Sequence, residues 1–232
     1  MNTPIHHSAG AFGPEVADAR ALALALIPAG TPDGKPLADR LAALIAIACA
    51  SSATTLNRAG IREAAERAYA AGATPDELHE AVMLVAALGV HALHEGTRVV
   101  ADVLRGHRAD PRLEGEPSPE AAERLAVLND PYWQRLDAEL PGFIDALARL
   151  SPAMFDAFRD FCSVPWRSGV LPAREKELIY VAVDAMPTHR FLPGLRFHVR
   201  NALALGVSPA EIVGALDIAA AAGPAWGIPA EP

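Results

Sequence analysis

Hydrophobic residues recur every three or four positions along most of the chain, with polar residues between them. Alanine and leucine dominate, and runs of the β-branched residues typical of strands are scarce. This spacing predicts an all-α fold. The stretch 105–119 is rich in proline, glycine and charge, which is typical of a linker. Besides the helices of the repeat described next, we expect helices over 15–27, 120–128, 132–140, 142–150 and 152–161.

An internal repeat organises the chain. Residues 37–89 align without a gap on residues 171–223, at a constant offset of 134 positions. In each copy a glycine ends one helix, and a Ser/Thr-Pro-x-Glu capping box starts the next. The repeat therefore predicts two tandem copies of one helical unit, with a first domain at 1–110 that includes an N-terminal arm and a second at 111–232. Identical pairs include Leu37/Leu171, Arg40/Arg174, Gly72/Gly206, Pro75/Pro209 and Glu77/Glu211.

The two copies differ in their titratable residues. A position needed only for packing can be apolar in both copies, so a titratable group found in one copy alone points to another role. At four positions the titratable group lies in the second copy and an inert residue lies in the first, and we therefore predict that the second copy carries the functional site. These four pairs are Ala43/Glu177, Ala50/Asp184, Thr55/His189 and Ala64/His198.

His198 is the principal catalytic candidate. It lies on the expected core-facing stripe of one helix, with Leu195, Ala202 and Leu205. A buried imidazole there must have a hydrogen-bond partner or take part in proton transfer. The alternative is a core histidine that is simply satisfied by a neighbour.

Glu177 is the second catalytic candidate. Glu177 and Asp184 are two helical turns apart and project from one face of the preceding helix. The alternative for this face is exposure to solvent, with Arg174 pairing with Glu177; we assign Asp184 to that alternative. His189 lies in the loop 187–193 and is either a second proton carrier or a surface residue.

Net charge limits the partners. A formal charge of −8 argues against nucleic acid, because phosphate binding requires a basic surface. The segment 185–210 has no Asp or Glu but contains Arg190, Arg196 and Arg200, which predicts the binding of a small anionic metabolite. The alternative is a solvated helix face. Arg196 has a counterpart, Arg62, in the first copy, so a structural role for it stays open.

Other classes of site receive little support. The two cysteines, Cys49 and Cys162, form no CxxC motif and no disulfide framework, and no segment has the pattern of a signal peptide or membrane span. A cytoplasmic protein is the expectation. His91 and His94 have the i, i+3 spacing of a metal pair, but no third ligand is evident. We assign neither metal nor cofactor.

The second copy resembles the carboxymuconolactone decarboxylase family. The resemblance rests on LPAREKELI at 171–179, LRFHVRNALALGVSPAEI at 195–212 and AAGPA at 221–225. It implies the alkylhydroperoxidase-D-like helical fold and, among the family, similarity to tandem two-domain members. Phe191 and Gly194 stand where the peroxidase branch has its CxxC, so thiol peroxidase activity is not expected. The family's histidine and helix glutamate match His198 and Glu177.

These features lead to one main hypothesis and two alternatives. The main one is a cofactor-free acid/base enzyme acting on a small carboxylated or enolisable metabolite, by decarboxylation or isomerisation of a lactone. His198 would deliver the proton, Glu177 would orient or recharge it, and Arg196 or Arg200 would hold an anionic group. The alternatives are a non-catalytic anion-binding or scaffold module and a metal-dependent enzyme using the histidines. The family resemblance also implies assemblies of three or six single domains. Because one chain holds two domain equivalents, three chains would reproduce a ring of six domains, and we predict a homotrimer.

Overall fold

The computed structural model describes residues 14–223, which form helices and connecting loops without any strand. The all-α prediction is therefore confirmed. Within this part of the chain, no helix has the length and apolar character needed to cross a membrane. The α-helices are α1 Pro14–Ala25, α2 Asp39–Ser51, α3 Arg58–Ala70, α4 Pro75–Ala86, α5 Val90–His107, α6 Pro119–Leu125, α7 Pro131–Glu139, α8 Phe143–Leu150, α9 Pro152–Arg167, α10 Ala173–Ala185, α11 Leu192–Ala204 and α12 Pro209–Ala221.

A central bundle contains the helices of both aligned segments. Helices α2, α3 and α4 start 134 residues before α10, α11 and α12, and residues from all six helices share one buried hydrophobic core. Leu56 and Arg190, equivalent loop residues, both have positive φ angles, of 47° and 50°. The hydroxyls of Thr54 and Thr188, also equivalent, lie 3.1 Å apart. The duplicated pattern thus coincides with matched local geometry, whereas the domain division at 110/111 stays a prediction.

Equivalent caps begin equivalent helices. The side chains of Thr74 and Ser208 cap α4 and α12, each in a capping box closed by a glutamate. Those glutamates, Glu77 and Glu211, also pair with an arginine of α2 and α10 respectively. The alternative in which Arg174 pairs with Glu177 is therefore wrong: Arg174 contacts Glu211 at 2.9 Å instead.

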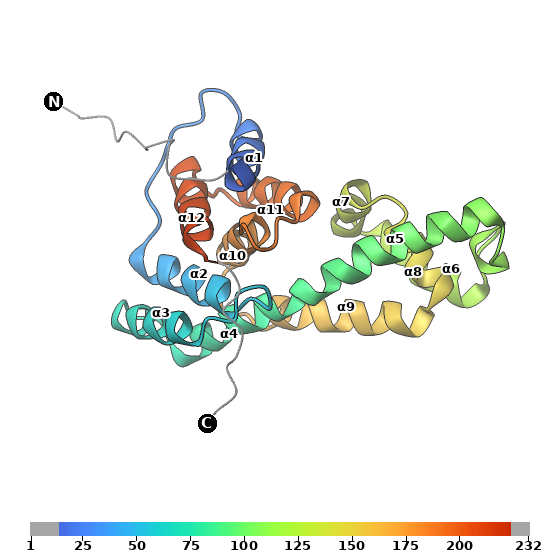
Figure 1. Cartoon of the computed structure of the whole chain (residues 1–232), viewed down its shortest axis with the longest axis horizontal. Coiled ribbons are helices and arrows are strands. Elements are labelled where there is room, and N and C mark those ends of the chain that lie inside the picture. The colour runs from blue at the N-terminus through green and yellow to red at the C-terminus, as the bar shows by residue number, and fades with distance from the viewer. Residues whose placement is uncertain (1–13, 224–232) are drawn as a thin grey trace.

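An arm of helices extends from the bundle and packs back toward it. Helices α5 to α9 project to one side, with α7 turned toward α11 (Figure 1). Helix α5 continues to His107, inside the predicted linker, which then includes a short 3₁₀ turn at Pro111–Leu113. Helix α9 runs six residues beyond the predicted end at 161. The arm has its own aromatic core, which includes Phe143, Phe155 and Phe158.

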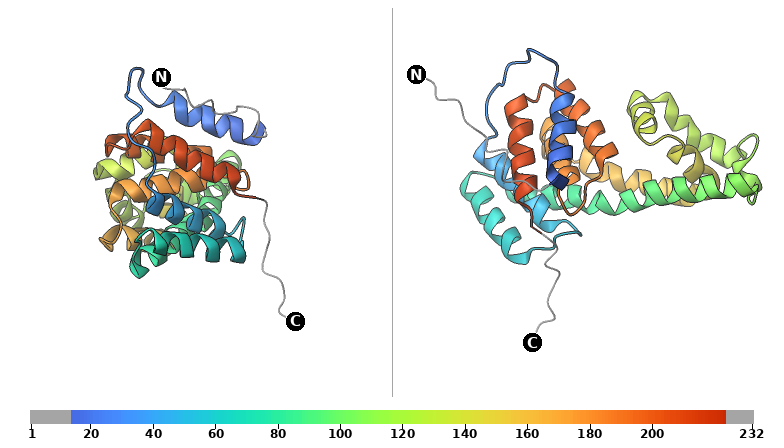
Figure 2. Two further views of the ribbon diagram at one scale, coloured as in Figure 1. Left: turned by 90° about the vertical axis from the view of Figure 1, so that its left-hand side faces the viewer. Right: turned by 45° about the horizontal axis from the view of Figure 1, so that its top comes forward.

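Helix α1 covers the bundle on the side of α11 and α12 (Figure 2). Arg20 of α1 pairs with Asp217 of α12 at 2.5 Å. Asp18, also on α1, pairs with Arg190 in the loop before α11. The N-terminal helix therefore supplies an acidic partner, Asp18, to the segment 185–210, which has no Asp or Glu of its own.

A buried ion pair joins the two aligned segments. Lys176 Nζ of α10 lies 3.0 Å from Glu80 Oε1 of α4, and both side chains are almost fully buried. Glu80 also accepts hydrogen bonds from the Ser168 hydroxyl and from the Leu171 amide, the latter at 2.6 Å. This network satisfies the buried charges through several partners, as burial requires.

Candidate functional site

The site is built on a histidine–carboxylate pair between two neighbouring helices of the second copy. His198 Nδ1 on α11 lies 2.6 Å from Glu177 Oε2 on α10. The amide of Asn201, one turn after His198, donates to Glu177 Oε1 at 3.1 Å. The ring of His198 stacks on Tyr180 with 4.6 Å between centroids. The two principal candidates are therefore in direct contact, and their orientation is fixed by neighbours.

The second carboxylate on α10 also faces His198. Asp184 Oδ2 lies 3.9 Å from His198 Nε2, so the imidazole has a carboxylate near each ring nitrogen. Asp184 is fully buried, which corrects its assignment to a solvated helix face. Neither of its oxygens has a hydrogen-bond partner among the described residues. The buried position follows from the packing of α10, which other helices cover on every side.

Electrostatics at the pair follow from burial and proximity. Burial lowers the pKa of His198, but the Glu177 carboxylate, aided by Asp184, outweighs this effect, so the pKa lies above its usual value. Burial raises the pKa of Asp184 to about 7; His198 opposes this rise and Glu177 adds to it. The site thus holds a histidine that retains its proton beside a carboxyl group that titrates near neutrality.

Two adjoining cavities reach this pair. A small cavity of about 70 Å³ is lined by His198 and by residues of α5, α7 and the loop before α11. A larger one, of about 580 Å³, is lined by Glu177 and Asn201 and falls in the range of small-molecule pockets. The side chain of His198 is 12% exposed, so it is accessible from a cavity without facing bulk water. Both cavities are lined by Tyr132, Trp133, Cys162 and Trp166.

The predicted arginines are distributed unevenly. Arg200 lines the larger cavity, and it also pairs with Glu139 at the end of α7. Arg196 donates to the same Glu139 at 2.6 Å and lines neither cavity. Arg190 also lines neither and pairs with Asp18. Tertiary structure thus brings the acidic partners Asp18 and Glu139 to the basic segment 185–210. Of the three arginines predicted to bind an anion, Arg200 lines a cavity and the other two do not.

The arm contributes residues that the sequence did not single out. Arg135 of α7 and Arg159 of α9 line the larger cavity beside Arg200, and Tyr132 lines both cavities. Their approach to the second copy depends on the path of the arm, for which no local signal exists. Asn201 is different, because it is aligned with a residue of another type, Arg67, in the first copy. A comparison of the copies that includes uncharged polar residues identifies it.

One correction applies to the helix of His198, and burial determines the state of the two cysteines. Leu205, expected on the core-facing stripe, is 45% exposed. Cys49 is buried, and burial raises its pKa to about 12; burial likewise raises the pKa of Cys162, to about 11. Both thiols are therefore protonated near neutral pH, and a thiol is a poor nucleophile compared with a thiolate.

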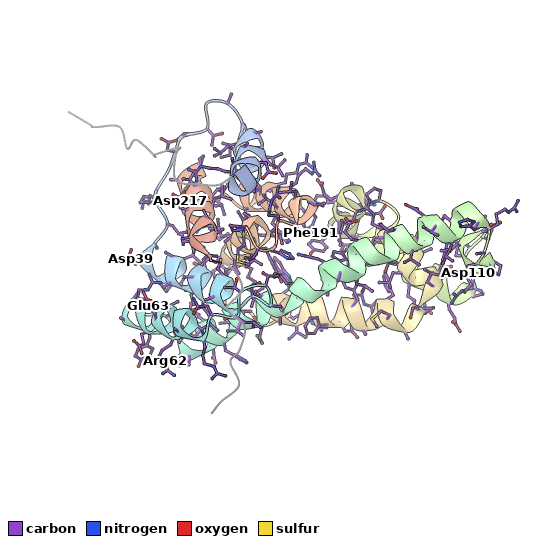
Figure 3. The ribbon with its side chains drawn as sticks, viewed as in Figure 1. Asp39, Arg62, Glu63, Asp110, Phe191 and Asp217 are labelled. Atoms are coloured by element: carbon purple, nitrogen blue, oxygen red, sulfur yellow. The ribbon has the colours of Figure 1, made fainter. Side chains whose placement is uncertain are left out.

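His189 belongs to a second cluster of titratable groups. Its Nε2 lies 2.7 Å from His91 Nδ1 on α5, and both atoms lie within 4 Å of Asp184 Oδ1. His94 is not part of this group: both its ring nitrogens lack hydrogen-bond partners within residues 14–223, and it packs against Phe143 and Phe158. The residue that accompanies His91 is therefore His189, from the second aligned segment. Phe191, stacked on His91, marks this junction between bundle and arm (Figure 3).

Fold and site together define an all-helical protein with a buried histidine–carboxylate pair beside internal cavities. The model of the carboxymuconolactone decarboxylase family matches residues 152–231. A crystal structure from Burkholderia xenovorans LB400, of a protein provisionally named a gamma-carboxymuconolactone decarboxylase subunit, is 36% identical. That match covers 79% of this chain and 71% of the other, with a TM-score of 0.65. No curated protein matches the sequence. The chain belongs to the carboxymuconolactone decarboxylase family, which confirms the resemblance.

Proposed function

We propose that the protein is a cofactor-free acid/base enzyme that decarboxylates or isomerises a small carboxylated lactone. The single observation that carries this proposal is the 2.6 Å contact between His198 Nδ1 and Glu177 Oε2 beside a cavity. A carboxylate on one ring nitrogen holds the imidazole in place and favours its protonated form, which leaves Nε2 available to donate a proton. The family relationship and the name of the Burkholderia protein support the reaction class.

The chemistry needs one proton donor and a way to hold negative charge. When the carboxylate of the substrate leaves as CO2, the electron pair of the broken carbon–carbon bond stays behind as a dienolate. His198 donates its Nε2 proton to carbon, and Glu177 stabilises the imidazolium beforehand. Proton transfer from a positioned group contributes about 10²–10⁴ in rate. His189 stays a candidate second proton carrier in this scheme, acting through the buried carboxyl group of Asp184 that both histidines approach.

Substrate binding follows from the charge of the larger cavity. Arg135, Arg159 and Arg200 all line it, against the two carboxylates of Asp130 and Glu177. An arginine can hold a carboxylate through two parallel hydrogen bonds. The substrate's anionic group therefore binds at this end, with its reacting carbon toward His198, where the two cavities share their aromatic lining. Of the arginines predicted from sequence, Arg200 is retained for this role, and Arg190 and Arg196 are assigned to ion pairs with Asp18 and Glu139.

The test compares His198→Ala with a matched histidine control. Alanine occupies the equivalent position 64 of the first copy, so the variant is expected to fold. Purified protein is incubated with gamma-carboxymuconolactone, and CO2 release and lactone consumption are measured. We expect His198→Ala to lose at least about 100-fold in rate, whereas His107→Ala, at an exposed position of α5, stays unchanged. Equal activity of the wild type and His198→Ala excludes the mechanism.

A non-catalytic anion-binding module is the alternative, and the basic lining of the larger cavity favours it equally well. Calorimetry separates the two. Tight binding of the lactone carboxylate without turnover, reduced by Arg200→Ala and unaffected by His198→Ala, supports a binding module. Turnover that depends on His198 supports the enzyme.

We also propose that three chains assemble into a ring. The Burkholderia relative is named as a subunit. Exposed apolar side chains on α5 and α9 suit a subunit interface: Val99 is 58% exposed, Val103 56%, Phe161 50% and Val164 49%. Each chain contains two copies of the helical unit, so a ring of three chains would contain six such units.

A further inference from the structure

Three potential metal ligands converge where the arm meets the bundle. His91 comes from α5, Asp184 from α10, and His189 from the loop that follows α10. His91 Nδ1 and His189 Nε2 are 2.7 Å apart, and they lie 3.7 Å and 3.8 Å from Asp184 Oδ1. All three ligand atoms fall within 4.8 Å of one another. Two imidazole nitrogens and one carboxylate oxygen form a donor set that first-row divalent metals prefer.

The buried carboxylate gives an independent reason to expect a cation. Asp184 is fully buried and both of its oxygens lack hydrogen-bond partners among the described residues. Leaving such a group unsatisfied is costly, and a bound cation removes the cost. The side chains of His91 and His189 are only 14% and 12% exposed, so neither is a mobile surface group.

The protonation of the histidines suits this role. Burial, followed by the neighbouring imidazoles, lowers the pKa of His91 far below its ordinary value. Burial likewise lowers the pKa of His189. Both shifts favour the neutral imidazole, which is the form that ligates metals once the hydrogen between the two facing nitrogens moves to the other nitrogen of its ring.

The separations match the dimensions of a zinc site. A point lying about 2.0 Å from all three ligand atoms satisfies the three distances, and Zn²⁺ binds nitrogen and oxygen at about 2.0–2.2 Å. In a regular tetrahedron the ligand atoms would be about 3.3–3.4 Å apart. The two nitrogens must therefore separate by about 0.6 Å and each approach the carboxylate by about 0.4 Å, which small side-chain rotations allow.

We propose that His91, Asp184 and His189 form a binding site for one divalent transition-metal ion of the zinc type. The site goes beyond the proposed acid/base function, because none of its three ligands takes part in the contact between His198 and Glu177. Asp184 connects the two: Oδ1 faces the histidine pair and Oδ2 faces His198 Nε2 at 3.9 Å. A cation on Oδ1 withdraws charge from the carboxylate that neighbours the catalytic imidazole. The first copy has Ala50 and Thr55 in place of Asp184 and His189, so the site exists once per chain.

The test measures zinc binding by the whole chain in the absence of substrate. Protein purified without a metal-affinity tag is stripped with EDTA, dialysed and titrated with ZnCl2 by calorimetry, with metal content checked by mass spectrometry. We expect about one equivalent per chain, and substitution with Co²⁺ should give the visible absorption of a four-coordinate ion. The thermal midpoint of the wild type should rise on adding ZnCl2.

Two variants remove ligands while preserving the fold. Asp184→Asn keeps the shape of the side chain, and His189→Thr introduces the residue that the equivalent loop of the first copy contains. Each should weaken zinc binding at least about tenfold and remove the thermal shift, with an unchanged circular dichroism spectrum. His6 and His7 are adjacent in sequence and can bind zinc themselves, so His6→Gln/His7→Gln serves as the matched control and should retain the site.

Two results overturn the proposal. One is the absence of stoichiometric zinc binding by the wild type, which leaves the 2.7 Å contact between His91 and His189 as a simple N–H···N hydrogen bond. The other is binding that survives both ligand substitutions but is lost in the control variant. Neither result bears on decarboxylation by His198, which is measured separately with the lactone.

Discussion

Breaking the contact between His198 and Glu177 one side at a time should show that the two side chains stabilise each other. His198→Ala leaves the buried Glu177 carboxylate with Asn201 as its remaining hydrogen-bond partner. Glu177→Ala leaves the Nδ1 side of a buried imidazole without its acceptor. An unsatisfied buried group costs about 1–3 kcal/mol, and more when it is charged. We therefore expect each single substitution to lower the free energy of unfolding by about 2–4 kcal/mol.

The double variant His198→Ala/Glu177→Ala reproduces the residues of the first copy, Ala64 and Ala43. Both unsatisfied groups are then absent, so its cost should be smaller than the sum of the singles by about 1–3 kcal/mol. A domain of this kind is stable by about 5–15 kcal/mol, so all three variants should remain folded at 25 °C. This difference between the double variant and the sum of the single variants is the coupling energy of the two side chains. It measures the strength of the contact on which the catalytic proposal depends.

Urea unfolding followed by far-ultraviolet circular dichroism and tryptophan fluorescence provides the assay. Trp166 stacks on Tyr180, which stacks on His198, so its fluorescence reports on the site itself. The wild type, the two single variants and the double variant form a double-mutant cycle. The cycle is valid if the free energy of unfolding depends on urea concentration with the same slope in all four proteins. His107→Ala gives the baseline for an exposed histidine. Strictly additive costs, with a coupling energy near zero, would refute the structural basis of the site.

Three further predictions concern stability, pH and assembly. Lys176→Met should lower the free energy of unfolding in urea by about 3–5 kcal/mol, because it leaves the buried Glu80 without its cationic partner. The double variant Lys176→Met/Glu80→Gln should recover most of that loss. A double variant as unstable as the single one would contradict the ion pair. Burial raises the pKa of Glu211, but hydrogen bonds from Ser208 and Arg174 outweigh this effect, so the pKa is lower in the folded than in the unfolded protein. The stabilisation that Glu211 contributes is therefore complete above the pKa of the unfolded state. It disappears as the pH falls through the pKa of the folded state. Thermal melts from pH 7 to pH 3 should therefore show a shallower acid loss for Glu211→Gln, and identical slopes would exclude the effect. Light scattering should give the mass of a trimer, and Val103→Asp should dissociate it into folded monomers, whereas a monomeric wild type would rule out the ring.

Much of the site was accessible from sequence because the two copies serve as each other's reference. Glu177, Asp184, His189 and His198, the four residues selected by comparing the copies, lie together in the structure. Asp184 was assigned wrongly because helical periodicity tells which residues share a face, but not whether another helix covers that face. In α10 every face is covered, and the residue expected in solvent is fully buried.

The sequence by itself determined the helices, their caps and the difference between the copies, since these depend on interactions between residues a few positions apart. Only the tertiary structure decided which charges meet. Asp18 and Glu139 reach the arginines of α11 and its preceding loop from distant helices, and His91 reaches His189 across 98 positions. Such pairs depend on how the arm and α1 pack against the bundle. Because burial then sets the protonation of each group, the chemistry of the site follows from packing and not from spacing alone.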